Sequence, residues 1–397
     1  MVYTSKNIYQ NQLNDIVEKG LYKNEWKITS SQSAQIKVLE DSNVEKDILN
    51  LCANNYLGLS NNEEIIEAAK NSLTEKGFGM SSVRFICGTQ DIHKELEFKL
   101  SLFLEKEDTI LFASAFDANT ALFEAILTEE DELFSDKLVH ASLIDGMRLC
   151  KAKKQIYNHS DMADLEKRLS ESTARIKMIV TDGVFSMDGD MAKLDEISLL
   201  SEKYNAMLVV DDCHATGFIG ESGKGTHEYF NVKDKVDIIT TTFGKALGGS
   251  MGGSISGPKE VIEILRQKAR PYLFSNALMP AIVSGTLKAL ELVENANEER
   301  KQLIAMSDYW KNGLVSLGFD VKEGSTPIIP IMLYESKVTQ EFSKRLFENG
   351  VYAVGFFYPV VAEGEARIRT QISSLHTKNQ LEQALRIFQK VKSELGV

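Results

Sequence analysis

Short apolar segments alternate with amphipathic segments through the middle of the chain. Short segments rich in apolar residues, typical of buried strands, lie at 109–113, 155–157, 176–181, 207–211 and 236–241. Apolar residues at helical spacing lie between and beyond them, at 117–127, 162–169, 194–204 and 261–268. This alternation predicts an α/β fold, with helices on both faces of a mostly parallel sheet. Ligands bind such sheets beyond the carboxyl ends of the strands, so the residues that follow each strand are candidates for a functional site.

The pattern changes after about residue 285. A long helical stretch is predicted from there to about 317, and a final helix over 378–395. A helix over 339–348 ends at Asn349-Gly350, and strand patterns lie at 327–333, 351–357 and 367–372. We therefore expect three parts: an N-terminal segment, 1–50, that packs on the small domain, a large domain, 51–285, and a small α+β domain, 286–397.

The composition excludes several functional classes. The 397 residues include 45 Lys and Arg against 57 Asp and Glu, a net charge of −12, and no basic block. Nucleic acid is therefore not an expected partner. The longest apolar runs, such as 206–210, are far shorter than the roughly 18 residues of a membrane span, so no membrane association is expected. The opening MVYTSKNIYQ has no signal-peptide pattern.

The cysteines predict neither a metal site nor a disulfide framework. Cys52, Cys87, Cys150 and Cys213 form no CxxC motif, so we expect no zinc or other bound metal. Reduced thiols in a cytoplasmic protein are the expectation.

Lys245 is the first candidate for chemistry. It follows the strand pattern at 236–241 and precedes a glycine-rich turn that begins at Gly248. A lysine that burial desolvates at such a strand end acquires a lowered pKa and can form a Schiff base. A solvated loop lysine is the alternative.

Asp211 and His214 form a second candidate group. Asp211 closes the apolar strand 207–211, and a carboxylate buried there needs a cationic partner. The protonated pyridine nitrogen of pyridoxal phosphate (PLP) is such a partner. His214 lies close enough to hydrogen-bond that carboxylate or the phenolic oxygen of the cofactor. The alternative for Asp211 is an acid that caps the next turn.

A phosphate site is predicted where a helix follows the strand at 109–113. Ala115 and Phe116 open this helix, and their backbone N–H groups favour an anion. The hydroxyl of Thr242 is a further candidate donor to the phosphate.

The combination of these groups resembles fold-type I PLP enzymes, in which an acid and a histidine on one strand end precede the lysine on a neighbouring one. Within that class the chain resembles the α-oxoamine synthase family and its glycine C-acetyltransferase branch, over nearly the whole length. The resemblance implies a large domain with a seven-stranded, mostly parallel sheet. The segments that carry it are 52–60 (CANNYLGLS), 77–97, 140–153, 181–190 (TDGVFSMDGD), 209–229, 237–249 (DIITTTFGKALGG), 270–276 (RPYLFSN) and 355–373.

The resemblance implies a role for each matching residue near the cofactor. Lys245 forms the Schiff base and then acts as the base, while Asp211 binds the pyridine nitrogen. His214 lies near the cofactor oxygen, and His140 stacks on the pyridine ring and contacts substrate. Ser186 lies close to the ring. A structural histidine at a strand end is the alternative for His140.

The remaining matches concern phosphate and substrate. Ala115, Phe116 and Thr242 match the phosphate site. Ser275 and Asn276 match a segment that reaches the phosphate of the neighbouring subunit, which implies a homodimer.

Two further matches concern the substrate itself. Arg369 matches the residue that binds the amino-acid carboxylate, as a planar guanidinium does well. Arg367 would face the same side of an alternating strand, so the residues alone do not separate the two. Asn54 matches a substrate-contacting position.

The implied reaction condenses glycine with acetyl-CoA to give 2-amino-3-oxobutyrate and CoA, in threonine degradation. Another α-oxoamine synthase, such as 8-amino-7-oxononanoate synthase or serine palmitoyltransferase, is the alternative within the family, since the same catalytic groups would serve it. An inactive binding scaffold with this fold is the alternative from another class. The basic residues near Arg148 and those at 266–270 are candidates for the anionic CoA, or solvated faces of helices.

Overall fold

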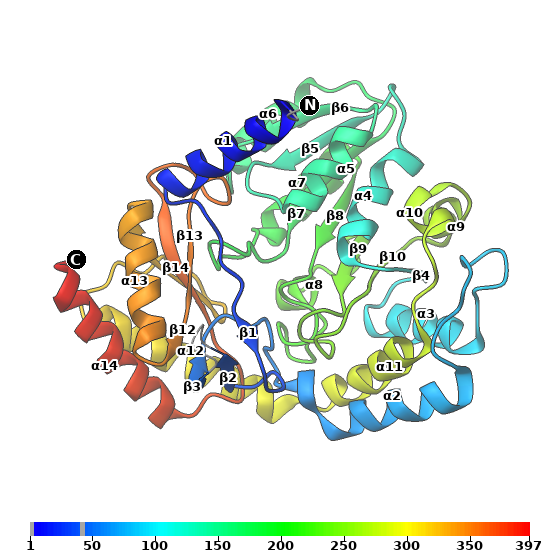
Figure 1. Ribbon diagram of the computed structural model, residues 1–397. Coiled ribbons are helices and arrows are strands. Elements are labelled where there is room, and N and C mark those ends of the chain that lie inside the picture. Colours follow the sequence, from blue (N-terminus) through cyan, green and yellow to red (C-terminus); the bar gives the residue numbers. More distant parts are fainter. Residues whose placement is uncertain (1–3, 40–43) are drawn as a thin grey trace. The chain divides into compact units, whose positions relative to one another are not determined.

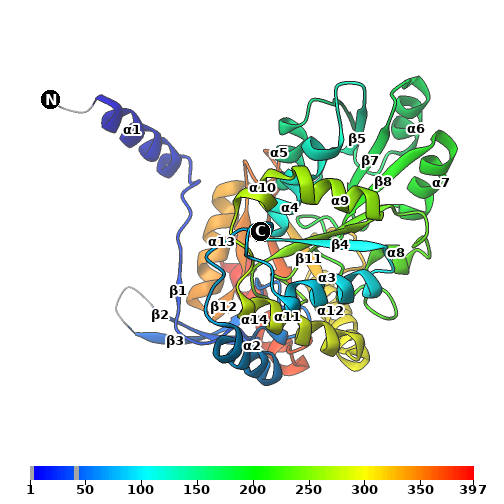
Figure 2. The ribbon, with the colours of Figure 1, turned by 90° about the vertical axis from the view of Figure 1, so that its right-hand side faces the viewer.

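The computed structural model describes residues 4–39 and 44–397 (Figures 1 and 2). The chain forms two compact units. The larger contains residues 54–186 and 190–302, and the smaller contains the described residues up to 53, together with 187–189 and 303–397. The chain passes from the larger to the smaller compact unit between residues 302 and 303. The domain boundary predicted at 285/286 stays a prediction.

A seven-stranded sheet forms the centre of the larger unit, in the order β4-β10-β9-β8-β7-β5-β6. Strands β5 to β9 pair in parallel, whereas β10 runs antiparallel to both of its neighbours. This architecture confirms the predicted α/β fold and its mostly parallel sheet. The strands are β4 (Asp108–Phe112), β5 (Glu132–Asp136), β6 (Lys153–Tyr157), β7 (Lys177–Asp182), β8 (Ala206–Asp211), β9 (Ile238–Thr242) and β10 (Gly253–Gly257).

The central strands are buried almost from end to end, as expected when helices cover both faces of a sheet. Ile110, Phe123, Val180 and Val209 are among the residues of its apolar core. Helices α4, α5, α9 and α10 lie together beside this sheet (Figure 2). The helices of this unit are α2 (Glu63–Lys76), α3 (Asp91–Phe103), α4 (Ala115–Ile126), α5 (Ala141–Leu149), α6 (Met162–Glu171), α7 (Leu194–Tyr204), α8 (Thr226–Tyr229), α9 (Lys259–Lys268), α10 (Arg270–Phe274) and α11 (Pro280–Glu294), with a short 3-10 turn, η1, at Leu59–Asn61.

Strand register places the polar residues that end the parallel strands at one edge of the sheet. Asp182 of β7 lies opposite Asp211 of β8, which in turn lies opposite Thr240 of β9. Because all three strands run the same way, the segments that follow them emerge at this same edge.

The smaller unit contains two further sheets. Strand β14 (Ala366–Gln371) lies between β11 (Ile328–Tyr334) and β13 (Val354–Phe356), antiparallel to both. The other sheet has the order β1-β2-β3-β12 and pairs the N-terminal segment with the strand after α13. Its strands are β1 (Lys27–Ile28), β2 (Gln35–Leu39), β3 (Glu45–Asn50) and β12 (Val351–Tyr352), and the unit's helices include α1 (Thr4–Glu18), α13 (Ser336–Glu348) and α14 (Lys378–Leu395).

Two expectations about the C-terminal part are wrong. The stretch to 317 is not one helix. Helix α11 ends at Glu294, and its C-cap Asn295, whose side chain bonds the Glu291 carbonyl at 2.9 Å, precedes α12 (Asn297–Ser316). The pattern at 351–357 is not one strand either. It contains β12 and β13, which belong to different sheets, with Ala353 between them.

No helix in the described ranges is long and apolar enough to cross a membrane.

Candidate active site

A cavity of about 220 Å³ opens at the carboxyl edge of the large sheet. It brings together seven of the residues that the sequence predicts for the site, from four separate strand ends. The full lining consists of Ser114, Ala115, Phe116, Asn119, His140, Ser142, Asp182, Val184, Asp211, Cys213, His214, Thr242 and Lys245.

The Asp211 carboxylate is buried in this cavity and is held by two donors. Its Oδ2 accepts the side-chain amide of Asn119 at 2.6 Å, and its Oδ1 accepts the backbone N–H of Cys213 at 3.0 Å. Hydrogen bonds from N–H donors favour the charged form of a carboxylate. The two donors therefore hold the Asp211 carboxyl group in a fixed position in the cavity lining.

Asn119 is a site residue that the sequence analysis did not identify. The same amide that binds Asp211 also lies 2.9 Å from the Ser142 hydroxyl, so it ties the start of α5 to the end of β8. The available signal was an amide residue one turn into a predicted helix, just before the apolar run at 121–123.

His140 caps the N-terminus of α5. Its Nδ1 accepts the backbone N–H of Ser142 at 3.2 Å, and its own backbone N–H donates to Asp182 Oδ1 at 3.0 Å. Burial lowers the pKa of His140, and the positive charge of Lys245 lowers it further, against an opposing effect of Asp211. The imidazole is therefore neutral at pH 7, with its ring position fixed by the helix start.

Asp182 was also not identified as a site residue, although the strand pattern at 176–181 ends just before it. Burial raises the pKa of Asp182 well above its usual range, and the neighbouring carboxylate of Asp211 raises it further. Two adjacent buried carboxyl groups do not readily ionise together. Burial and the neighbouring carboxylate therefore both favour the protonated form of Asp182.

The first turn of α4 borders the cavity and provides an anion site. Ser114 caps this helix through its hydroxyl, which accepts the Asp117 N–H at 3.0 Å, while Ala115 and Phe116 follow as the first helical residues. Strand β10 passes so close that a Cβ on Gly253 would lie 2.5 Å from the Ala115 nitrogen. Free N–H groups at a helix N-terminus favour an anion such as phosphate, and Thr242 lies beside them in the lining.

Lys245 follows β9 and lines the same cavity as Asp211. A PLP site requires these two residues to lie in one cavity. The turn after it passes through Gly248 and Gly249 with φ of 98° and 71°, a left-handed conformation that favours glycine. A Cβ on Gly249 would also lie 2.2 Å from the Ser60 hydroxyl. The glycines thus let the chain turn tightly directly after the lysine.

The sequence matches a known family over most of its length. Residues 46–388 match the family described as aminotransferase class I and II. The 2-amino-3-ketobutyrate coenzyme A ligase of Escherichia coli (strain K12) is 51% identical over 395 residues, which cover 98% of each chain. The chain belongs to the 2-amino-3-ketobutyrate coenzyme A ligase family. The resemblance found in the sequence is thereby confirmed.

Two further comparisons place this family among its neighbours. The 8-amino-7-oxononanoate synthase of Thermosipho melanesiensis is 46% identical over 98% of each chain. A solved structure of SPT with PLP superposes with a TM-score of 0.93 at 26% identity and covers all of both chains. The predicted fold-type I architecture is confirmed by this match together with the seven-stranded sheet.

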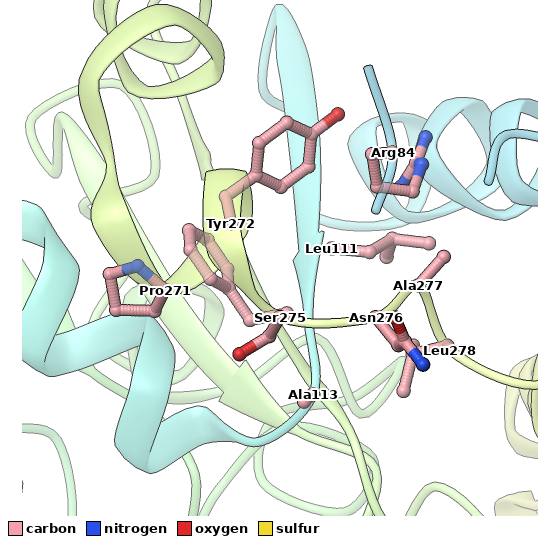
Figure 3. A pocket seen from close by; sticks show the side chains of 10 residues that line it. Arg84, Leu111, Ala113, Pro271, Tyr272, Ser275, Asn276, Ala277 and Leu278 are labelled. Atoms are coloured by element: carbon pink, nitrogen blue, oxygen red, sulfur yellow. The ribbon is translucent and has the colours of Figure 1, made fainter. Parts of the chain in front are cut away.

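Four of the residues predicted from the resemblance to this family lie outside the cavity lining in the described part of the larger unit. Ser186 is half-buried in the loop that the Val184–Met191 bridge closes, and Asn54 is half-buried. Ser275 and Asn276 line a second cavity of about 10 Å³, together with Arg84 (Figure 3). Their roles stay predictions.

The two arginines that the ARIRTQ motif leaves open make different contacts. Both lie in β14 of the smaller unit. The Arg367 guanidinium donates to Asp188 at 2.8 Å, to the Met187 carbonyl at 3.0 Å and to Glu365 at 2.9 Å. These N–H groups therefore bind acceptors within the protein. The Arg369 guanidinium lies 4.7 Å from the ring centre of Phe356. As the resemblance implies, Arg369 stays the predicted carboxylate ligand.

No group of three or more His, Cys, Asp or Glu side chains is arranged to hold a metal ion in residues 4–39 and 44–397.

Proposed function

We propose that this protein is a PLP-dependent acyltransferase that condenses glycine with acetyl-CoA, giving 2-amino-3-oxobutyrate and CoA, as a glycine C-acetyltransferase of threonine degradation. The supporting observation is the single cavity that contains Lys245, Asp211, His140 and His214 beside a helix N-terminus. The 51% identity to a 2-amino-3-ketobutyrate coenzyme A ligase supports the same reaction.

The residues of the cavity fit PLP. The buried anion of Asp211 suits a protonated pyridine nitrogen, the first turn of α4 with Thr242 suits the phosphate, and Lys245 supplies the amine. When bound, PLP withdraws electrons from the Cα atom of an amino-acid substrate. Asp211 keeps the ring nitrogen protonated, and the neutral ring of His140 suits packing against a flat heterocycle.

The protein's side chains manage the protons and the charge. Lys245 takes the Cα proton of glycine as the Cα–H bond breaks. The Cα–C bond forms to the acetyl carbon, the C–S bond breaks, and the electron pair leaves with the sulfur of CoA. His140 donates a hydrogen bond to the developing oxyanion in this proposal. Arg369 holds the glycine carboxylate, which the product retains, and Asn54 contacts the substrate.

A homodimer is part of the proposal. Ser275 and Asn276 are predicted to reach the phosphate of the partner subunit. Phe78, Phe85 and Phe274 are 81%, 63% and 70% exposed in the larger unit, which supports a covered interface there. A cytoplasmic location is proposed as well, in keeping with four cysteines that form no disulfide.

An assay of thiol and carbon dioxide together tests the reaction. The PLP-loaded enzyme is given glycine and acetyl-CoA, and we expect thiol release without carbon dioxide. Lys245→Ala should abolish turnover and still bind PLP non-covalently. Activity that needs a longer acyl-CoA, with release of carbon dioxide, would assign the chain to a decarboxylating sister branch. The 46% identity to an 8-amino-7-oxononanoate synthase makes that the second candidate.

A further inference from the structure

The side chain of Tyr56 contacts the cavity residue His214 at its Nδ1 atom. Its hydroxyl lies 2.8 Å from His214 Nδ1, and both side chains are buried in the larger unit. His214 in turn lines the cavity, whereas Tyr56 does not belong to the lining. The imidazole thus connects the Tyr56 hydroxyl with the cavity.

Packing fixes the position of the Tyr56 ring. The ring stacks on Phe218 with centroids 4.2 Å apart and planes inclined by 26°, and it meets the His214 ring edge-on with centroids 6.3 Å apart. A hydroxyl on a ring that is held in this way has little freedom to leave its partner. The hydrogen bond therefore restrains the rotation of the imidazole.

The bond also bears on which ring nitrogen carries the proton, because the phenol hydroxyl either donates to Nδ1 or accepts from it. A neutral imidazole has one donor nitrogen and one acceptor nitrogen, and the partner of one nitrogen sets the state of the other. When the phenol donates to Nδ1, the proton of His214 lies on Nε2. His214 then offers an N–H donor, rather than a lone pair, to an acceptor in the cavity.

We propose that Tyr56 is a positioning residue that fixes the orientation and the Nε2–H tautomer of His214, so that His214 donates to the phenolic oxygen of bound PLP. This inference rests on the proposed function, because it takes PLP as the acceptor. Tyr56 is not part of the cavity lining, so in this proposal it acts on bound PLP through His214.

Tyr56→Phe tests the proposal, since it removes the hydroxyl and keeps the ring on Phe218. The readout is the pH at which the visible absorbance band of bound PLP titrates, measured without substrate. We expect Tyr56→Phe to shift this midpoint by about half to one pH unit. The reason is that His214, once it is no longer oriented by Tyr56, loses its hydrogen bond to the chromophore. The matched control is Tyr204→Phe, which removes a half-buried hydroxyl that bonds Glu166 at 3.2 Å outside the cavity. It should keep the wild-type midpoint.

The His214→Asn background separates positioning from packing. There, adding Tyr56→Phe should produce no further shift, because the two residues act as one unit. An unchanged midpoint in Tyr56→Phe, or an equal shift in Tyr204→Phe, overturns the proposal. A wild-type protein that shows no visible band with PLP contradicts the proposed function instead, which keeps the two failures distinct.

A measurement on the unsubstituted chain covers the case in which Tyr56→Phe does not fold. The ¹⁵N chemical shifts of His214 in the PLP-loaded protein report its tautomer. We expect a protonated Nε2 and an unprotonated Nδ1, and the reverse assignment overturns the proposal.

Discussion

At the scale of single residues, the cavity depends on contacts between side chains that lie far apart in the sequence. The candidates Lys245, Asp211, His140 and His214 were identified because each follows an apolar strand or a family motif. Asn119 was not identified, because its role depends on a contact with Asp211, 92 residues away. Local patterns locate strand ends but do not show which side chains meet there.

The contact between Asn119 and Asp211 leads to the first prediction. Asn119→Ala removes the 2.6 Å hydrogen bond to the buried carboxylate, so it should lower kcat/KM by about tenfold to a hundredfold, in line with a lost bond to a charged group. Steady-state kinetics with glycine and acetyl-CoA measure this. Asn158→Ala, at an exposed position, is the control and should match the unsubstituted enzyme. Wild-type kinetics in Asn119→Ala would contradict the assigned role.

At the scale of elements, His159 connects two segments that border the site. Its Nδ1 lies 3.0 Å from Asp136 at the end of β5, and its Nε2 lies 2.9 Å from Asp190, in the segment that follows β7. Burial lowers the pKa of His159, but the hydrogen bonds to Asp136 and Asp190 outweigh it and raise the pKa to about 10. The histidine therefore stays protonated in the folded protein at neutral pH.

A pH dependence of stability follows, which is the second prediction. The folded-state pKa of about 10 exceeds the value of about 6.5 in the unfolded chain, so the stabilisation is fully present below pH 6.5. It is lost as the pH rises from there through 10. Melting curves of wild type and His159→Gln should therefore differ most at pH 6 and converge near pH 10. A constant difference over this range would show that the charge of His159 does not contribute.

The close passage of β10 over the start of α4 gives the third prediction. A Cβ on Gly253 would lie 2.5 Å from the Ala115 nitrogen, so Gly253→Ala must displace the helix start. We expect a loss of about 1–3 kcal/mol in the free energy of unfolding, with weaker PLP binding. Denaturant unfolding and PLP titration measure the two effects. Gly79→Ala has no atom within 4 Å of its new Cβ and is the neutral control. Equal effects of the two substitutions would refute the steric argument.

Element boundaries were predictable where one periodicity ran without interruption. Helices 194–204 and 378–395 begin and end where the pattern predicts. The prediction failed where neighbouring elements share a similar apolar pattern, as α11 and α12 do, or where the chain passes from one sheet to another, as at Ala353. Which sheet a short strand joins depends on distant partners and is not encoded locally.

At the scale of the whole molecule, the exposed aromatic side chains lead to the fourth prediction. The chain has a mass of 44.4 kDa. It should sediment at twice that mass if a second copy covers exposed aromatic side chains such as Phe274. Phe274→Glu places a charge in that interface and should shift the protein toward the monomer, with loss of activity. Sedimentation of both proteins at matched concentration tests this. A wild-type monomer with full activity would exclude the homodimer.

The adjacency of Asp182 and Asp211 across two strands has a consequence for insertions and deletions. Side chains alternate between the faces of a strand, so a shift of β7 by one residue against β8 would separate the two carboxyl groups. In the link between these strands, residues 183–191 include the cavity residue Val184 and the His159 partner Asp190, whereas α7 contributes nothing to the cavity lining. Length variation among natural or engineered relatives should therefore collect around α7 and be absent from 183–191 and from the strands themselves.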